Sequence, residues 1–199
     1  LEEGAHVMTM STYKSLAGPA GGLIVTNEAD IAEKLDAIAF PGMTANFDAA
    51  KSAALAITML DWKTCGEAYA REMIAVSQSL AVDLEAAGLP VFASSEGRTA
   101  SHQFAVEAAR FGGGQAASKT LRKSGFLACG IGLPIEAVEG DLNGLRIGTP
   151  ELVRWGLTTD HTKKLANLIV RGLTTNNPAE LAREVAEFRS EFNQIQFVR

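Results

Sequence analysis

The sequence predicts an α/β fold, in which a piece of a larger sheet, a helical link and a small α/β domain follow one another. In residues 6–25, apolar and hydroxyl residues alternate, a glycine-rich turn follows, and a short apolar run ends the segment. Residues 47–88 contain almost no helix breakers and are rich in alanine, leucine and methionine. Beyond residue 90, strand-like and helix-like patterns alternate. This order of elements excludes an all-β fold.

The first part of the chain, residues 1–47, is predicted to contain a strand, a loop, a second strand and a short helix. Asn27 followed by acidic residues is an N-cap signature, and apolar residues at helical spacing follow it as far as the Phe-Pro-Gly segment at 40–42. Residues 48–86 are predicted to form connecting helices. Gly66 is the expected interruption, which leaves open two long helices or one bent helix.

The last part, residues 87–199, is predicted to be a small α/β domain. Three glycines at 112–114 open a helix whose buried face carries Ala116 and Leu121. Apolar residues at three- and four-residue spacing predict the two closing helices. The expected elements are strands at 90–92, 102–106, 127–131 and 145–147 and closing helices at 162–172 and 178–188.

Composition narrows the class of protein. Of 199 residues, 47% are hydrophobic and 21% charged, which indicates a globular chain with a real core. A net charge of -5 without a basic cluster argues against nucleic acid as a partner. No apolar stretch reaches the roughly 20 residues of a membrane helix. Cys65 and Cys129 lack partners at ligand spacing, so no metal and no disulfide scaffold are expected, and a reducing cytoplasm is the default location.

The most informative segment places one lysine, Lys14, among hydroxyls and glycines, in the order TMSTYKSLAGPAGG from residue 9 to residue 22. A lysine that forms an imine must lose its proton near neutral pH, which a desolvating, close-packed pocket favours. Ser11 and Thr12 can hold a phosphate or a phenolic oxygen, and the glycines let the backbone approach a planar ring. The alternative is an ordinary solvated lysine beside a turn.

The order of these residues favours a pyridoxal site. The segment resembles the active-site lysine segment of serine hydroxymethyltransferases, in which threonines lead to a His-Lys pair, a leucine, a Gly-Pro and two glycines. A second segment, GLRIGTPE at 144–151, resembles the one whose arginine binds the substrate carboxylate, and a guanidinium offers a carboxylate two parallel donors. For Arg146 the alternative is a surface ion pair. The Phe-Pro-Gly segment is a third, weaker match, to a loop that reaches across the dimer.

The resemblance spans residues 6–172 and implies fold type I, the aminotransferase-like α/β architecture. It implies that residues 1–47 end the large domain that binds pyridoxal phosphate, that 48–86 connect, and that 87–199 form the small C-terminal domain. The family's aspartate at the pyridine nitrogen, its ring-stacking histidine and part of its phosphate cup lie upstream of the lysine. The missing N-terminal half of the same enzyme is therefore an expected partner, and a homodimer is expected as well.

The resemblance also implies the roles of five residues. Lys14 is the catalytic residue and forms the Schiff base with pyridoxal 5'-phosphate. Lys14, Ser11, Thr12 and Tyr13 bind the cofactor, and Arg146 binds the carboxylate of a small amino-acid substrate. The implied activity is that of a transferase of amino-acid and one-carbon metabolism, which transfers a hydroxymethyl group between serine and glycine.

Three departures from the family pattern bear on this activity. Tyr13 stands where the family has histidine, Ala20 stands where it has arginine, and Thr-Ala-Asn-Phe at 44–47 replaces Gln-Gly-Gly-Pro. They leave the use of tetrahydrofolate open and favour an alternative, a folate-independent β-hydroxy-amino-acid aldolase or an α-methylserine-type hydroxymethyltransferase. An alternative of another class is a non-catalytic fragment or subunit that binds a partner chain.

Other candidate residues have simpler interpretations. Asp160 and His161 are predicted at a helix start, where Asp160 caps the helix and His161 is exposed. The glycines at 112–114 can cradle a phosphate, although a glycine-rich loop alone is weak evidence. Trp62 and Trp155 are predicted to be core or interface residues.

Overall fold

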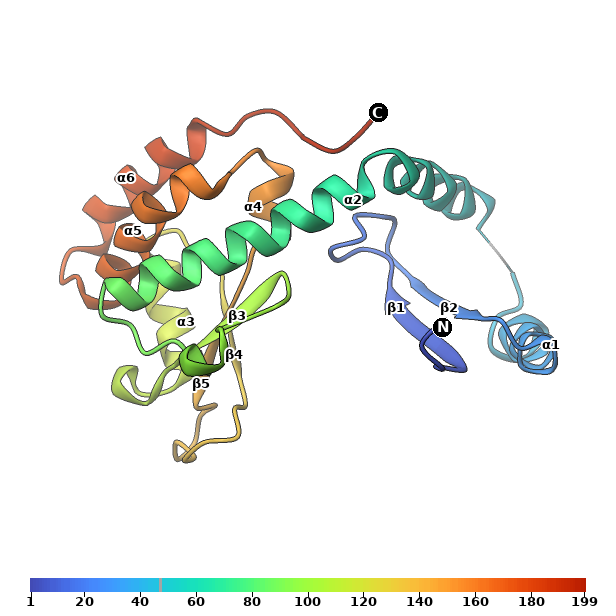
Figure 1. Ribbon diagram of the computed structural model, residues 1–199, viewed down its shortest axis with the longest axis horizontal. Coiled ribbons are helices and arrows are strands. Elements are labelled where there is room, and N and C mark those ends of the chain that lie inside the picture. Colours follow the sequence, from blue (N-terminus) through green and yellow to red (C-terminus); the bar gives the residue numbers. More distant parts are fainter. Residues whose placement is uncertain (47) are drawn as a thin grey trace. The chain divides into compact units, whose positions relative to one another are not determined.

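The computed structural model describes residues 1–46 and 48–199 (Figure 1). Predictions that involve Phe47, the last position of the 44–47 segment and of the first predicted domain, lie outside the described residues. The chain divides into two compact units, Leu1–Cys65 with Arg199, and Gly66–Val198. This boundary falls inside the predicted connecting segment 48–86, and the predicted three-part division stays a prediction.

The first unit contains a hairpin and a short helix. Strands β1 (Val7–Ser11) and β2 (Gly22–Thr26) pair antiparallel, as the strand-loop-strand pattern predicts. Helix α1 (Ala29–Ala37) follows and leads into η1 (Ile38–Met43). The predicted cap at Asn27 is wrong, because the N-cap is Glu28, whose backbone N–H donates to the Thr26 hydroxyl oxygen at 3.0 Å.

Helix α2 (Ala49–Ala86) is a single helix of 38 residues that belongs partly to each unit. Of the two open alternatives, the structure therefore has one helix. Gly66 does not interrupt it, because the helix continues through this position, where Gly66 is buried. From Gly66 onward, a stripe of buried residues recurs at three- and four-residue spacing, which makes this part of α2 a core helix of the second unit. The stripe comprises Tyr69, Met73, Val76, Leu80 and Leu84.

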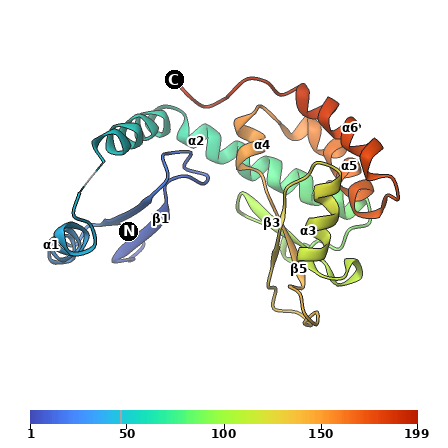
Figure 2. The ribbon, with the colours of Figure 1, turned by 180° about the vertical axis from the view of Figure 1, so that it is seen from behind.

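The second unit contains a three-stranded antiparallel sheet in the order β3-β5-β4. Helix α3 packs against β4 and β5, and α5 and α6 pack against α3 and each other, as Figure 2 shows from behind. Short 3-10 helices lie at 94–96, 109–111 and 159–161. The elements are β3 (Gln103–Glu107), α3 (Gly114–Lys123), β4 (Cys129–Ile131), β5 (Gly144–Gly148), α4 (Pro150–Arg154), α5 (Thr162–Thr174) and α6 (Pro178–Ser190).

Two predicted strands of this unit need correction. Residues 90–92 form no strand, because Val91 makes only an isolated bridge to Val106. The strand predicted at 127–131 begins at Cys129, since Leu127 is 88% exposed and outside the ladder. The closing helices α5 and α6 lie where the apolar spacing predicts them. Of the helices in the described part of the chain, none combines the length and apolarity needed to cross a bilayer.

Candidate functional site

The loop that carries Lys14 joins β1 to β2 and is folded around Thr12. The Thr12 hydroxyl donates to the Pro19 carbonyl oxygen at 2.5 Å, and the Gly18 N–H donates to the Thr12 carbonyl oxygen at 2.7 Å. The Thr12 N–H donates to the Gly21 carbonyl oxygen at 3.0 Å, and Thr12 is only 2% exposed. The Thr12 hydroxyl proton is therefore committed to the loop itself, so the structure gives Thr12 a part in shaping the loop around Lys14.

Lys14 lies at the exposed tip of this loop. Its ammonium nitrogen lies 6.0 Å from the centroid of the Tyr13 ring, and Tyr13 is 56% exposed. Ser11 is half-buried at the end of β1. Within residues 1–46 and 48–199, neither the Lys14 amine nor the Ser11 hydroxyl has an ion-pair or hydrogen-bond partner. Both groups can therefore accept a ligand, but the close-packed, desolvating pocket expected around Lys14 is not formed by the described residues.

The same loop packs against α2 through Trp62. The Trp62 indole N–H donates to the Leu16 carbonyl oxygen at 2.8 Å. A Cβ atom on Gly18 would lie 2.9 Å from the Thr12 carbonyl oxygen and 3.4 Å from side-chain atoms of Leu55 and Thr58. Gly18 thus allows the loop to approach the helix, whereas the sequence predicted that it would allow approach to a cofactor ring. Sequence reasoning missed this contact, because it treated Trp62 only as a core or interface residue.

Arg146 occupies the middle of β5, the central strand of the sheet in the second unit. Its neighbours across the ladder are Ala105 on β3 and Cys129 on β4. Side chains alternate along a strand, so Leu145 and Ile147 face the buried side while Arg146 is exposed on the other side. None of the ion pairs among the described residues involves Arg146, which argues against the surface ion-pair alternative.

The end of β5 is fixed to α2 by hydrogen bonds from Thr149 and Tyr69. Thr149 is fully buried, and its hydroxyl lies 2.8 Å from the Met73 carbonyl oxygen and 3.1 Å from that of His102. The Tyr69 hydroxyl donates to the Pro150 carbonyl oxygen at 2.8 Å. Burial raises the pKa of Tyr69, so its proton stays available for this bond at neutral pH. Neither Tyr69 nor Thr149 was predicted as a site residue.

The glycine-rich segment at 112–114 leads directly into backbone N–H groups that bind a carboxylate of the chain itself. The Asp141 carboxylate accepts hydrogen bonds from the backbone N–H groups of Gln115 and Ala116, both at 2.9 Å, at the start of α3. A Cβ atom on Gly113 would come within 2.6 Å of the Asp141 carboxylate, and one on Gly114 would overlap the Gly144 carbonyl oxygen. The glycines therefore serve close packing, and the position a phosphate would take is filled by Asp141.

Replacing Asp141 with asparagine is expected to lower the urea midpoint of unfolding near neutral pH. Hydrogen bonds from Gln115, Ala116 and Leu142 lower the pKa of the folded Asp141 carboxyl, the Gln115 bond most strongly. Stability from a lowered pKa is present above the carboxyl's ordinary value, about 3.9, and is lost as pH falls through the lower folded value. The urea midpoints of wild type and Asp141→Asn should therefore become equal in strong acid. Asp160→Asn is the control and should leave the urea midpoint unchanged both near neutral pH and in strong acid. A difference in midpoint between wild type and Asp141→Asn that stays constant at all pH values would contradict this role of Asp141.

The prediction for Asp160 and His161 is wrong in its details. The cap of the short 3-10 helix Thr159–His161 is Thr158, whose N–H donates to the His161 ring nitrogen Nδ1 at 3.1 Å. His161 is half-buried and packs edge-on against Phe192 with ring centroids 4.9 Å apart. Asp160 is exposed beside this capping box. These residues are structural, and His161 is more enclosed than the sequence predicts.

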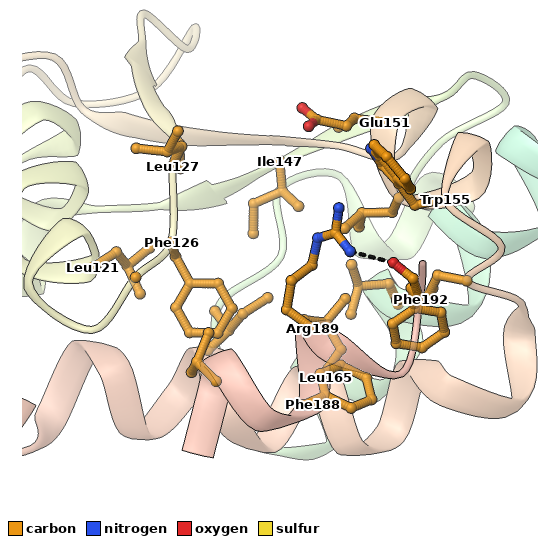
Figure 3. A pocket seen from close by; sticks show the side chains of 18 residues that line it. Leu121, Phe126, Leu127, Ile147, Glu151, Trp155, Leu165, Phe188, Arg189 and Phe192 are labelled. Atoms are coloured by element: carbon orange, nitrogen blue, oxygen red, sulfur yellow. Dashed lines mark hydrogen bonds between the residues drawn. The ribbon is translucent and has the colours of Figure 1, made fainter. Parts of the chain in front are cut away.

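A cavity of about 360 Å³ lies within the second unit, on the side of β5 that Ile147 faces (Figure 3). Its walls are mainly apolar. The Arg189 guanidinium lies 4.6 Å from the Trp155 ring centroid and donates to the Phe192 carbonyl oxygen, as the dashed line in Figure 3 marks. Trp155 thus lines the cavity, in keeping with a core or interface residue. Arg146 is not among the lining residues, so this cavity is separate from the predicted substrate site.

Comparison with known proteins identifies the family. The family model of serine hydroxymethyltransferase matches residues 2–169. The chain belongs to the serine hydroxymethyltransferase family. An alpha-methylserine aldolase from a Ralstonia species is 58% identical over 100% of this chain and 46% of its own length. The serine hydroxymethyltransferase of Pyrobaculum arsenaticum is 34% identical over 99% of this chain and 46% of its own length.

A solved structure supports the fold. The L-threonine transaldolase from Pseudomonas fluorescens, determined in its internal aldimine state, matches with a TM-score of 0.87 and 22% identity, covering 98% of this chain and 45% of that one. The predicted resemblance and the α/β, fold type I class are thereby confirmed. This chain spans less than half the length of the relatives it matches.

The structure groups the predicted site residues in two places. Ser11, Thr12, Tyr13 and Lys14 lie in one hairpin loop of the first unit, whereas Arg146 lies on a strand of the second. The features that the sequence missed are the supports of these residues: Trp62 for the loop, and Tyr69 with Thr149 for the strand. A sequence signal existed only for Thr149, which follows three residues after Arg146 in the GLRIGTPE segment.

Proposed function

We propose that the longer polypeptide containing this chain is a pyridoxal-phosphate enzyme that cleaves a β-hydroxy α-amino acid between its α- and β-carbons without folate. The observation that carries this proposal is the 58% identity to an alpha-methylserine aldolase along the whole chain, against 34% for a serine hydroxymethyltransferase. The departures at Tyr13 and Ala20 point the same way. On α-methylserine, breaking the Cα–Cβ bond and returning a proton to Cα yields alanine and formaldehyde.

The residues of the Lys14 loop fit the cofactor. Lys14 offers an exposed primary amine without a carboxylate partner in the described chain, so it can bond to an aldehyde carbon. Ser11 offers a hydroxyl for an oxygen of the cofactor, and Tyr13 offers a ring and a hydroxyl beside the amine. When bound, pyridoxal phosphate supplies an electron-accepting ring that stores the pair released at Cα. Thr12 is proposed to contribute to cofactor binding indirectly, because its hydrogen bonds to Pro19 and Gly18 shape the loop that carries Lys14.

Arg146 is proposed to orient the substrate through its carboxylate. The small neighbours Ala105 and Cys129 leave the guanidinium uncovered on the open face of the sheet. A planar fork then meets the carboxylate with two hydrogen bonds and fixes its orientation. Two such bonds restrict the rotation of the bound substrate about its carboxylate.

The proposal extends to assembly, domains and location. In the first unit Met8, Ile24, Phe40 and Met43 are exposed apolar residues, which supports burial of parts of this unit in a larger assembly, such as a homodimer with the preceding part of the enzyme. Residues 1–47 would then end the cofactor-binding domain, 48–86 connect and 87–199 form the small domain. Two free cysteines, Cys65 and Cys129, are compatible with a reducing cytoplasm and with a role in amino-acid metabolism.

Purified full-length polypeptide loaded with pyridoxal phosphate should release formaldehyde and alanine from α-methylserine without tetrahydrofolate. Both products are measured, because formaldehyde alone could arise from oxidation of another component of the assay. Omitting the cofactor is the control and should remove the activity. A requirement for tetrahydrofolate, with serine as the better substrate, would contradict the aldolase proposal.

The second candidate is hydroxymethyl transfer between serine and glycine, a reaction of one-carbon metabolism. The observation that favours it is the match of the serine hydroxymethyltransferase family model over residues 2–169. In the same assay this candidate predicts folate-dependent conversion of serine and little product from α-methylserine. A full-length polypeptide that converts neither substrate and retains no cofactor would support the non-catalytic alternative.

A further inference from the structure

We propose that two aromatic residues of α2, Trp62 and Tyr69, are positioning residues that hold the Lys14 loop and the Arg146 strand, respectively. The inference rests on the proposed function, because it assigns a task to the supports of two proposed site residues. Each aromatic side chain donates one hydrogen bond to a backbone carbonyl that lies a few residues beyond the site residue it supports. Neither is in direct contact with a reacting group in this account.

Trp62 attaches the Lys14 loop to α2. Thr12 closes the loop from within, through its bonds to Pro19 and Gly18, but these bonds do not attach the loop to anything else. The Trp62 indole attaches it to α2 through the Leu16 carbonyl oxygen, two residues after Lys14. Together with the close approach of Gly18 to Leu55 and Thr58, this bond fixes the backbone of an exposed loop on α2, and it therefore helps to determine where the Lys14 amine stands.

Tyr69 holds the end of the Arg146 strand. Its hydroxyl donates to Pro150, and the buried Thr149 side chain bonds to the Met73 carbonyl of the same helix. The Tyr69 ring is itself fixed, with the Arg154 guanidinium 4.3 Å from its centroid and Phe197 5.2 Å away on another side. One buried and one part-buried hydrogen bond therefore anchor the start of α4, directly after β5, on α2. A substrate carboxylate bound by Arg146 inherits this placement.

A pure packing role would predict different consequences. Tyr69→Phe keeps the ring and removes only the hydroxyl, which leaves the Pro150 carbonyl without its donor and also ends the hydrogen bond between this hydroxyl and Arg154. Trp62→Phe likewise removes the indole N–H that reaches Leu16. If the hydrogen bonds serve only stability, each variant should unfold more easily but treat cofactor and substrate as wild type does. If the hydrogen bonds position the loop and the strand, Trp62→Phe should weaken cofactor binding and Tyr69→Phe should weaken substrate binding.

The test uses the full-length polypeptide and two titrations. Cofactor-free protein is titrated with pyridoxal phosphate and followed by absorbance, and cofactor-loaded protein is assayed by initial rates over a range of α-methylserine concentration. Trp62→Phe is expected to weaken cofactor retention by roughly three- to tenfold, the loss of one hydrogen bond, and to leave the substrate KM within about twofold. Tyr69→Phe is expected to raise the substrate KM by a similar factor, with cofactor retention and kcat nearly unchanged.

Matched controls are available in the chain. Trp155→Phe makes the same replacement at the other tryptophan and should change neither titration. Thr149→Ser keeps the buried hydroxyl and should retain the wild-type KM, whereas Thr149→Val should resemble Tyr69→Phe, so the strand is tested even if one variant fails to fold. Normal binding by Trp62→Phe and Tyr69→Phe, or equal losses in both titrations, would overturn the positioning roles. A wild type that binds neither ligand would overturn the proposed function and this inference together.

Discussion

Replacing Lys14 with alanine is expected to abolish covalent attachment of pyridoxal phosphate and to reduce turnover by roughly 10⁴-fold or more, the scale at which loss of a covalent group is felt. The physical reason is that no other group of the loop is a primary amine. The fold should be unaffected, because Lys14 is exposed and has no ion-pair partner in the described chain. Absorbance of the bound cofactor and formaldehyde release measure the two effects.

Two variants separate this role from general loss of charge. Lys14→Arg keeps the positive charge but has no amine that can attack an aldehyde, so it should be as inactive as the alanine variant. Lys34→Ala removes another exposed lysine of the same unit, at the end of α1, and should keep the bound cofactor. Activity in Lys14→Arg, or cofactor retained covalently in Lys14→Ala, would show that a different residue carries the cofactor.

Replacing Arg146 with lysine is expected to raise the KM for the amino-acid substrate by about 100-fold, while kcat falls less. Lysine keeps the charge but replaces a planar two-donor fork by a point charge, so the carboxylate is bound less firmly and in no fixed orientation. Initial rates over a wide range of α-methylserine concentration measure both constants.

The matched control is Arg122→Lys, which makes the same change at an exposed arginine in the last turn of α3. It should leave the KM unchanged. Cofactor absorbance should be normal in both variants, since Arg146 has no proposed contact with the cofactor. An unchanged KM in Arg146→Lys would remove Arg146 from the substrate site and leave its exposure on β5 without a proposed use.

Periodicity and breaker residues predicted most of the fold, because the elements involved are locally encoded. The hairpin around Lys14 and the amphipathic helices α5 and α6 have their apolar residues at the spacing that each structure requires. The failures occur where burial depends on distant residues. Val91 is buried but makes only an isolated bridge and forms no strand, and Leu127 is an apolar residue that is exposed to solvent. Neither outcome is visible in the local pattern.

The candidate site shows the same division. Lys14 and Arg146 were found because each lies in a contiguous segment with a specific residue order. Trp62 and Tyr69 were missed because their hydrogen-bond partners are 46 and 81 positions away in the sequence. Asp141 was missed for a similar reason, since it caps a helix that begins 25 or more residues earlier. Their importance depends on tertiary structure alone.

The central claim, that Lys14 holds pyridoxal phosphate, is tested most directly by borohydride reduction of the full-length wild-type polypeptide followed by peptide mapping with mass spectrometry. Reduction converts the bond between cofactor and amine into a stable pyridoxyl adduct, whose position in the sequence is then read out. An adduct is expected on Lys14 and on no other lysine. An adduct on a different lysine, or no adduct in a folded and cofactor-saturated protein, would contradict the claim.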